Sequence, residues 1–247
     1  MKHVEIIILA GGKGTRMESE GPKALVKLKG KPFLRHVTDT LKKLELPRNP
    51  IIVIGYMAED VATEMGDHFR YAKQNEQLGS GHAVLTAKSV THPEHTTVFV
   101  SYTDHPLLKA DTIKKIIDRQ QETGSVIVMG TAVVPDFDDW RINFEKFARI
   151  KRDADGSLIG LVEYKDATEE EKEIKEVNPA YFAFDADWMW ANLENIGNNN
   201  AQKEYYLTEL VNIALAQGKK IETIQIDPKE ALGANSKQEL EVLESLI

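Results

Sequence analysis

The sequence predicts an α/β fold in which a mostly parallel, Rossmann-like sheet is flanked by helices and carries a small β-rich lobe. Three observations support this prediction. Apolar strand segments alternate with segments of helical periodicity over the first 134 residues. A glycine-rich loop follows the first apolar segment directly. Later in the chain, Asp155-Gly156 lies between two strand segments, and Asp-Gly is a strong hairpin signal.

Composition limits the class of protein. The chain has 247 residues, of which 42% are hydrophobic and 28% are charged, as in ordinary globular proteins. The length suits a single domain over residues 1–247, with an α/β part at about 1–134 and a β-rich lobe at about 135–225. The formal net charge of −8 argues against nucleic-acid binding. The absence of cysteine excludes disulfides, thiolate metal sites and cysteine nucleophiles.

The chain shows neither a signal-peptide pattern nor an apolar run long enough to span a membrane. We expect a cytoplasmic protein that does not bind membranes. The sequence leaves its oligomeric state open.

The first half of the chain predicts alternating strands and helices. The apolar run 4–9 is dense in β-branched residues, which is typical of a buried parallel strand. Pro32 suits a first helical position, and apolar residues recur at helical spacing over 32–44. Further strands are expected at 51–56, 96–102 and 125–134, with helices at 58–69, from 83 onward and at 110–123. Right-handed crossovers between such elements produce parallel strands.

The second half predicts the lobe and the closing helices. A hairpin is expected at 149–165, an acidic helix at 167–175 and one strand over 177–184. Helices at 186–196 and 204–216, a strand at 221–226 and a last helix at the C-terminus complete the prediction. The acids of the 135–140 loop could hold a second metal ion, but a solvated loop explains them better.

The glycine loop after the first strand has the composition of an anion-binding turn. It reads Ala10-Gly11-Gly12-Lys13-Gly14-Thr15-Arg16-Met17, and Lys23 follows in a Pro-Lys-Ala-Leu segment. Glycines permit positive φ and close approach of a ligand, and successive backbone N–H groups bind anions. Neither the Walker pattern nor the dinucleotide fingerprint fits. A triphosphate cradle with Arg16 and Lys23 as cations is one interpretation, and a plain glycine turn is the other.

Two later segments carry candidate polar groups. Asp104 follows the most apolar strand, and a carboxylate at the tip of a central strand is well placed to bind a metal ion. Gln74 precedes a loop in which Gly79 and Gly81 flank Ser80, and its amide has the donor and acceptor needed to read a pyrimidine edge. A turn residue and a polar loop are the plainer interpretations. His82 and His105 are assigned structural roles.

The order of these segments resembles the sugar-1-phosphate nucleotidyltransferases, and in particular the bacterial N-acetylglucosamine-1-phosphate uridyltransferases. Besides the glycine loop through Lys23, the resemblance rests on Gln-Leu-Gly-Ser-Gly-His-Ala at 77–83, Val-Glu-Tyr-Lys-Asp-Ala-Thr at 162–168 and Asn-Ala-Gln-Lys-Glu-Tyr-Tyr-Leu-Thr-Glu at 200–209. It spans nearly the whole chain. It implies the uridyltransferase domain alone, because nothing like the family's C-terminal acetyltransferase repeats follows in this sequence.

The resemblance implies a role for each candidate residue. UTP and a sugar 1-phosphate would be the substrates and Mg²⁺ the cofactor. Arg16 and Lys23 would be the catalytic cations. The nucleotide would be bound by Leu9, Ala10, Gly11, Gly12, Gly14, Thr15, Gln74, Gly79 and Ser80. The sugar would contact Tyr102, Thr103, Ala148, Glu163 and Asn178, and Asp104 and Asn235 would bind the metal ion.

The departures from the family pattern lie on the sugar side. Thr103 replaces the family's glycine in Tyr-Gly-Asp, Pro179-Ala180 replaces Thr-Gly after Asn178, and Ala148 stands where another glycine is expected. N-Acetylglucosamine 1-phosphate is therefore the expected acceptor, while glucose, glucosamine or an alcohol phosphate remain alternatives. A protein that binds UTP or a UDP-sugar without turnover is the alternative from another class.

Overall fold

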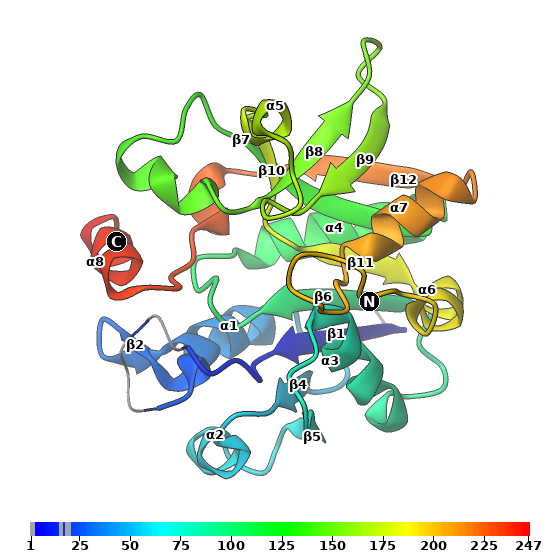
Figure 1. Cartoon of the computed structure of the whole chain (residues 1–247). Helices are drawn as coiled ribbons and strands as arrows, with labels where there is room; N and C mark the ends of the chain where they lie inside the picture. Colours follow the sequence, from blue (N-terminus) through cyan, green and yellow to red (C-terminus); the bar gives the residue numbers. More distant parts are fainter. Residues whose placement is uncertain (1–2, 15–16, 18–20) are drawn as a thin grey trace.

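The computed structural model describes residues 3–14, 17 and 21–247 (Figure 1). Within these ranges a ten-stranded sheet has the order β5-β4-β1-β6-β11-β7-β10-β8-β9, and β12 pairs with β7. Its strands are β1 (Val4–Leu9), β4 (Ile51–Ile54), β5 (Arg70–Lys73), β6 (Thr97–Tyr102), β7 (Ile127–Val133), β8 (Ala148–Arg152), β9 (Leu158–Val162), β10 (Glu176–Asn178), β11 (Phe182–Asp185) and β12 (Ile221–Gln225). A short hairpin, β2 (Lys27–Leu28) with β3 (Lys31–Pro32), lies apart from it. No described helix is long and apolar enough to cross a membrane.

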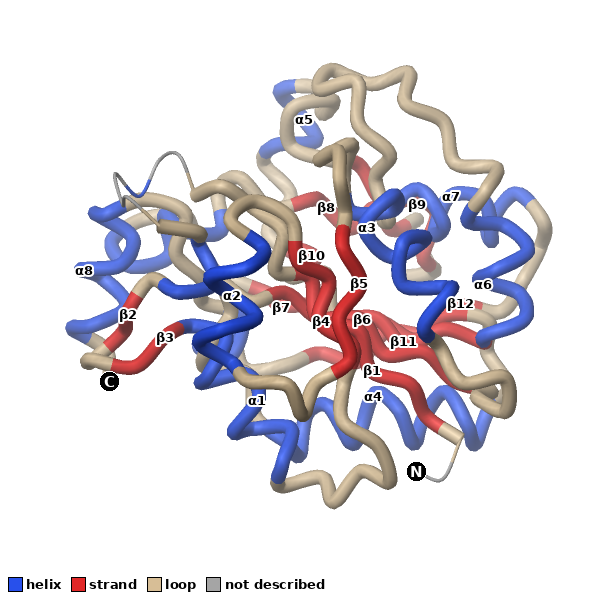
Figure 2. Tube along the Cα trace, turned by 90° about the horizontal axis from the view of Figure 1, so that it is seen from below, coloured by secondary structure: helices blue, strands red, loops and turns tan. Residues whose placement is uncertain are grey.

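Helices cover both faces of this sheet. The first face packs against α1 (Phe33–Lys42), α2 (Ala58–Met65) and α4 (Ala110–Thr123), and the second against α3 (Ser80–Ala87), α6 (Ala186–Leu193) and α7 (Glu209–Ala216). Figure 2 shows α1 and α4 on one side of the sheet and α3, α6 and α7 on the other. In β1, Ile6 and Ile8 face the first group while Ile7 and Leu9 face the second, as strand alternation requires. The predicted α/β class is confirmed.

The strand directions are mixed where the lobe begins. β5, β4, β1 and β6 are parallel, as the alternation of elements predicts, but β11 lies antiparallel between β6 and β7. The expected single strand 177–184 is therefore wrong, because it forms β10 and β11 at different places in the sheet. Pro179 cannot donate to a ladder, and Ala180 has a φ of 62°, so the chain turns between the two strands. Residues 135–225 thus supply β11 and β12 to the central sheet as well as β8, β9 and β10.

Helix lengths differ from expectation where glycines and caps intervene. The helix expected over 58–69 ends at Met65, because Gly66 follows with a φ of 90°. The acidic helix expected over 167–175 is only α5 (Glu169–Lys172), which begins at a capping box formed by Thr168 and Glu171. The last helix, α8 (Lys237–Ser245), is capped by the side chain of Ser236.

The carboxyl ends of β1, β4 and β6 meet at one edge of the sheet. There the N–H of Ala10 donates to Val53 O at 2.8 Å, and the N–H of Thr103 donates to Leu9 O at 3.2 Å. These bonds bring the glycine loop and the Thr103-Asp104 turn together. In open α/β sheets this edge is where ligands bind.

Candidate functional site

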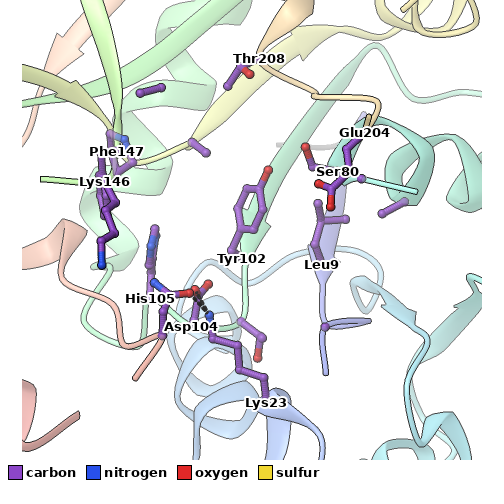
Figure 3. Close-up of a pocket in the computed structure, with 18 of the residues that line it drawn as sticks. Leu9, Lys23, Ser80, Tyr102, Asp104, His105, Lys146, Phe147, Glu204 and Thr208 are labelled. Atoms are coloured by element: carbon purple, nitrogen blue, oxygen red, sulfur yellow. Dashed lines mark hydrogen bonds and ion pairs between the residues drawn. The ribbon is translucent and has the colours of Figure 1, made fainter. Parts of the chain in front are cut away.

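A cavity of about 530 Å³ lies at this edge, between the glycine loop and the lobe. Figure 3 shows Lys23, Asp104 and His105 at one end, Leu9, Ser80 and Glu204 along one wall, and Lys146 and Phe147 along the opposite wall. Residues predicted from the sequence that line it are Leu9, Gly11, Gly12, Lys23, Gln74, Gly79, Ser80, Tyr102, Thr103, Asp104, Ala148, Glu163, Asn178 and Asn235. The fold therefore brings the predicted nucleotide, sugar and metal residues to one cavity.

The glycine loop is fixed by its neighbours. A Cβ on Gly11 would lie 3.1 Å from Gln74 Oε1, and a Cβ on Gly14, whose φ is 67°, would lie 3.0 Å from Lys23 Cβ. Gly11 O also accepts a hydrogen bond from Tyr56 N at 3.1 Å. Side chains at these positions would separate the loop from the residues beside it. Ala10 is buried beside the cavity. Thr15 and Arg16, which are also predicted site residues, lie outside the described residues.

Three polar side chains meet at one end of the cavity. The ammonium of Lys23 donates to the carboxylate of Asp104 and to the amide oxygen of Asn235. These residues come from the 3₁₀ turn Lys23–Leu25, the end of β6 and the segment before α8. The side chains of Lys23 and Asp104 are both 13% exposed, so this ion pair is well shielded from water. One cation thus bridges the two oxygens that the resemblance assigns to Mg²⁺.

The segment carrying Asn235 packs directly on the Asp104 turn. A Cβ on Gly233 would lie 2.7 Å from Asp104 O and closer still to the ring of His105, so only glycine fits there. Ala234 N donates to Asp104 O at 3.3 Å, and Asn235 N donates to Glu239 Oε2 at 2.7 Å. This close contact places the Asn235 amide beside a carboxylate that comes from a distant part of the chain.

The charge of Asp104 is set by its surroundings. Burial alone would raise its pKa, but the positive charge of Lys23, the charge that His105 carries when protonated and the hydrogen bond from Lys23 outweigh burial and lower the pKa below its usual value. The carboxylate is therefore ionised at neutral pH. An ionised carboxylate is what a divalent cation requires.

Gln74 and Ser80 are already engaged with the protein. The amide nitrogen of Gln74 donates to Gly79 O at 3.3 Å and lies 2.9 Å from His82 Nδ1. Ser80 Oγ accepts from Leu207 N at 2.9 Å. Gly79 has a φ of 112°, and a Cβ there would lie 2.6 Å from Tyr205 O. The Gln74–Ser80 loop is thus held against residues 204–207, and His82 contacts Gln74 from the helix that follows it.

On the lobe side, Glu163 is held by Thr208, whose hydroxyl donates to Glu163 Oε1 at 2.6 Å. Burial raises the pKa of Glu163, and the negative charges of Asp166 and Glu204 act in the same direction, while the bond from Thr208 opposes them. Burial likewise raises the pKa of Tyr102, so its hydroxyl remains protonated. A smaller cavity of about 290 Å³ shares Glu163 and Thr208 with the first.

Asn178 and Ala180 form a strained turn in the wall of the cavity. Asn178 Oδ1 accepts from Ala180 N at 2.7 Å, and Asn178 Nδ2 lies 3.3 Å from Met129 Sδ. Ala180 has a φ of 62°, in the left-handed region, at the position where the resembling family has glycine. An alanine in this conformation costs about 1–2 kcal/mol more than in a right-handed one.

Replacing Ala180 by glycine is therefore expected to stabilise the protein by about 1 kcal/mol, because glycine adopts this φ without strain. Thermal unfolding should show a midpoint higher by roughly 2–4 °C. Ala183→Gly, in the buried strand β11, is the matched control and should destabilise. An unchanged or lower midpoint for Ala180→Gly would contradict the assigned strain.

Several residues that line the cavity were not predicted from the sequence as site residues, and one of them was assigned a structural role. His105, assigned a structural role, lines the cavity and stacks on Phe147 with ring centroids 5.8 Å apart. Lys146, Phe147, Glu204 and Thr208 also line it. Glu204 and Thr208 belong to the 200–209 stretch that carries the resemblance, so that stretch could have indicated them as site residues. Nothing in the sequence around Lys146 marks it as a site residue.

The acidic 135–140 loop is held by hydrogen bonds to its own residues and to Arg141. Asp136 Oδ1 accepts from Asp138 N at 2.9 Å and from Arg141 Nε at 2.6 Å, which is the arrangement of an ordinary loop. Among the described residues, no group of three or more histidine, aspartate or glutamate side chains is arranged to hold a metal ion.

Comparisons with known proteins show what the chain is similar to. The family model of the MobA-like NTP transferase domain matches residues 6–155. The bifunctional protein GlmU of Brevibacillus brevis is 35% identical over 246 residues, which are 99% of this chain and 52% of that protein. GlmU of Clostridium acetobutylicum is 39% identical over 235 residues, which are 95% of this chain and 50% of that protein. The chain thus spans about half the length of these curated relatives.

A solved structure supports the fold. A candidate glucose-1-phosphate thymidylyltransferase from Bacillus anthracis, solved in complex with sucrose, superimposes with a TM-score of 0.75 over 98% of this chain and 94% of that one. Its sequence identity is 17%, so this likeness concerns the fold alone.

Proposed function

Because the chain belongs to the family of MobA-like NTP transferase domains, we propose that it transfers a uridylyl group from UTP to a sugar 1-phosphate. The proposed acceptor is N-acetylglucosamine 1-phosphate, and the products are UDP-N-acetylglucosamine and diphosphate. The resemblance over nearly the whole chain and the likeness to half of GlmU support this choice.

One observation carries the proposal. Lys23, Asp104 and Asn235 meet in a single cavity that has the glycine loop on one side and Glu163, Ala148 and Asn178 on the other. A nucleotide on the loop and a sugar against the lobe would bring their phosphates together at this meeting point. A regulatory protein that bound only UTP would not need the second half of the cavity, whereas one that bound a UDP-sugar without turnover would, so diphosphate release separates that alternative from the proposed activity.

The residues present fit a magnesium ion. The carboxylate of Asp104 and the amide oxygen of Asn235 both contact the Lys23 ammonium, so one small cation can reach both oxygens. Mg²⁺ prefers oxygen ligands and retains water or phosphate at its other positions. We infer that Asp104 and Asn235 would hold it. When bound, it would neutralise charge on the phosphates.

The chain's own groups would orient two polyanions. The attacking oxygen of a sugar phosphate is already anionic, so the reaction requires positive charge and in-line geometry and no general base. Lys23 would bind the reacting phosphates, and the N–H groups of the glycine loop would bind the triphosphate. Glu163, oriented by Thr208, would accept a hydrogen bond from a sugar hydroxyl.

The test is diphosphate release across a panel of nucleoside triphosphates and phosphorylated acceptors. We expect UTP with N-acetylglucosamine 1-phosphate to give turnover. Because Thr103, Ala148 and Ala180 add bulk to the sugar side, we also expect a shifted or relaxed preference among hexose 1-phosphates. UTP binding in calorimetry without diphosphate release for any acceptor would contradict the proposed activity.

A pH dependence follows from the raised pKa of Glu163. We expect the KM for the sugar 1-phosphate to rise as the pH falls, because protonation converts a charged acceptor into a weaker neutral one. The rise in KM should begin at a pH above about 4.3, the usual pKa of glutamate. Asp104, whose pKa is lowered, remains ionised at that pH. The measurement is KM against pH. A Glu163→Gln variant should have a high KM and lack this dependence, so the same pH profile in both proteins would contradict the role of Glu163.

A further inference from the structure

The charges lining the cavity are poorly matched to two phosphorylated substrates. Among the described lining residues, the carboxylates are Asp104, Glu163, Glu204 and Glu239, and the ammonium groups are Lys23 and Lys146. Lys23 is engaged by Asp104 and Asn235. Lys146 makes no hydrogen bond or ion pair with any described residue, and its side chain is exposed. Among the described lining residues, Lys146 is thus the lysine whose ammonium group has no partner in the described part of the protein.

The backbone around Lys146 is rigidly held although its side chain is free. Arg149, which is fully buried, donates to Glu145 O at 2.6 Å and also to Phe147 O. These are the carbonyls of the two residues that flank Lys146. Arg149 also donates to Phe144 O at 3.4 Å and to Lys172 O at 3.1 Å. A buried arginine therefore fixes the segment that presents Lys146 to the cavity.

Lys146 is directed toward the reacting end of the cavity. Phe147 stacks on His105, and Asp104 next to His105 contacts Lys23. In Figure 3 the ammonium end of Lys146 extends toward the end where His105 and Asp104 lie, from the wall opposite Leu9 and Ser80. Leu9 and Ser80 belong to the proposed nucleotide side. A ligand group bound by Lys146 would therefore approach from the acceptor side.

Three residues that line the same cavity carry buried polar atoms without partners. Thr103 Oγ1, His105 Nδ1 and Asn143 Oδ1 have no hydrogen-bond partner among the described residues, and these side chains are 4–7% exposed. Unpaired polar atoms at such burial are rare and costly in proteins, so stability does not explain why the cavity lining keeps these three side chains. All three residues line the cavity with Lys146.

We propose that Lys146 binds the phosphate of the acceptor, in a subsite whose wall is completed by Thr103, His105 and Asn143. This inference rests on the proposed transfer to a sugar 1-phosphate and assigns one binding residue to the acceptor rather than to UTP. Lys146 neutralises the attacking phosphate and is a substrate-binding residue. Lys23 then serves the donor, so the two lysines divide the two polyanions between them.

The test compares Lys146→Gln with the wild type. The KM for the sugar 1-phosphate should rise about tenfold, as expected for loss of a charge-assisted hydrogen bond, while the KM for UTP changes less than about twofold. Lys146→Arg should restore most of the affinity because it keeps the charge. Lys151→Gln is the matched control, since Lys151 lies on β8 and pairs with Glu171 away from the cavity.

Direct binding gives a second readout that does not depend on turnover. In calorimetry with a non-cleavable UTP analogue present, the sugar 1-phosphate should bind Lys146→Gln more weakly than it binds the wild type. The neutral parent sugar should bind both proteins equally. Equal affinity of both proteins for the sugar 1-phosphate would overturn the inference, as would a rise confined to the KM for UTP. A wild type that releases no diphosphate with any acceptor would instead overturn the proposed function, and binding would still test Lys146.

Discussion

Replacing Asp104 by asparagine is expected to lower turnover by roughly a hundredfold or more, which is the scale for removing one electrostatic contact to the reacting groups. The amide of the variant would keep an oxygen toward Lys23 but would lose the charge that the structure keeps ionised. The proposed magnesium ion would then lose its one anionic protein ligand among the described residues. The measurement is diphosphate release at saturating UTP and acceptor.

The control for this prediction is stability. Because Asp104 pairs with Lys23 in a shielded position, the variant should unfold at a somewhat lower temperature yet remain folded at the assay temperature. In the wild type, Mg²⁺ with UTP should raise the unfolding temperature, and this shift should shrink in Asp104→Asn. Near-full activity of a folded variant would remove Asp104 from the proposed metal site.

Replacing Lys23 by alanine is expected to have two opposite effects. Turnover should fall by a similar factor, roughly a hundredfold or more, because the reacting phosphates lose a fixed cation. Mg²⁺ should nevertheless bind the nucleotide-free protein more tightly than it binds the wild type. The reason is that the Lys23 ammonium occupies the place between Asp104 and Asn235, and its removal frees both oxygens.

Calorimetric titration with Mg²⁺ and the diphosphate assay measure these two effects separately. Lys27→Ala is a suitable control, since Lys27 is exposed on the nearby strand β2 and does not line the cavity. Weaker Mg²⁺ binding in Lys23→Ala would show that Lys23 supports the metal site rather than occupying it. Asp104→Asn should lose both turnover and metal binding, so the two variants are distinguishable.

Much of the fold could be predicted because its elements are strongly patterned. β1 and β6 are apolar through most of their length, and α1 and α4 repeat apolar residues at helical spacing. β5 was missed because Arg70 to Lys73 is a short, mostly polar strand at the sheet edge, which has no apolar alternation to detect. The separation of β10 from β11 was missed because it depends on tertiary pairing: β11 inserts between β6 and β7.

Site residues could be predicted where they lie close together in the sequence. They could not be predicted where only the fold brings them into contact. Asp104 lies just beyond the end of β6 and could be predicted from the strand pattern alone. Asn235 required the resemblance, because its position next to Lys23 and Asp104 depends on Gly233 fitting against His105. The hydrogen bonds of Gln74 to Gly79 and His82 were not foreseeable from local sequence. Lys146 was missed because its placement depends on Arg149 binding the carbonyls on either side of it.

Titration of the wild type with UTP, in Mg²⁺ and then in a chelator, tests most directly whether the nucleotide and the metal ion share this end of the cavity. The same titrations are needed on Asp104→Asn and Asn235→Ala. We expect UTP to bind tightly only with Mg²⁺, and both substitutions to weaken that binding while leaving the residual binding in chelator unchanged. UTP affinity that is equal with and without Mg²⁺, and indifferent to both substitutions, would contradict the shared site.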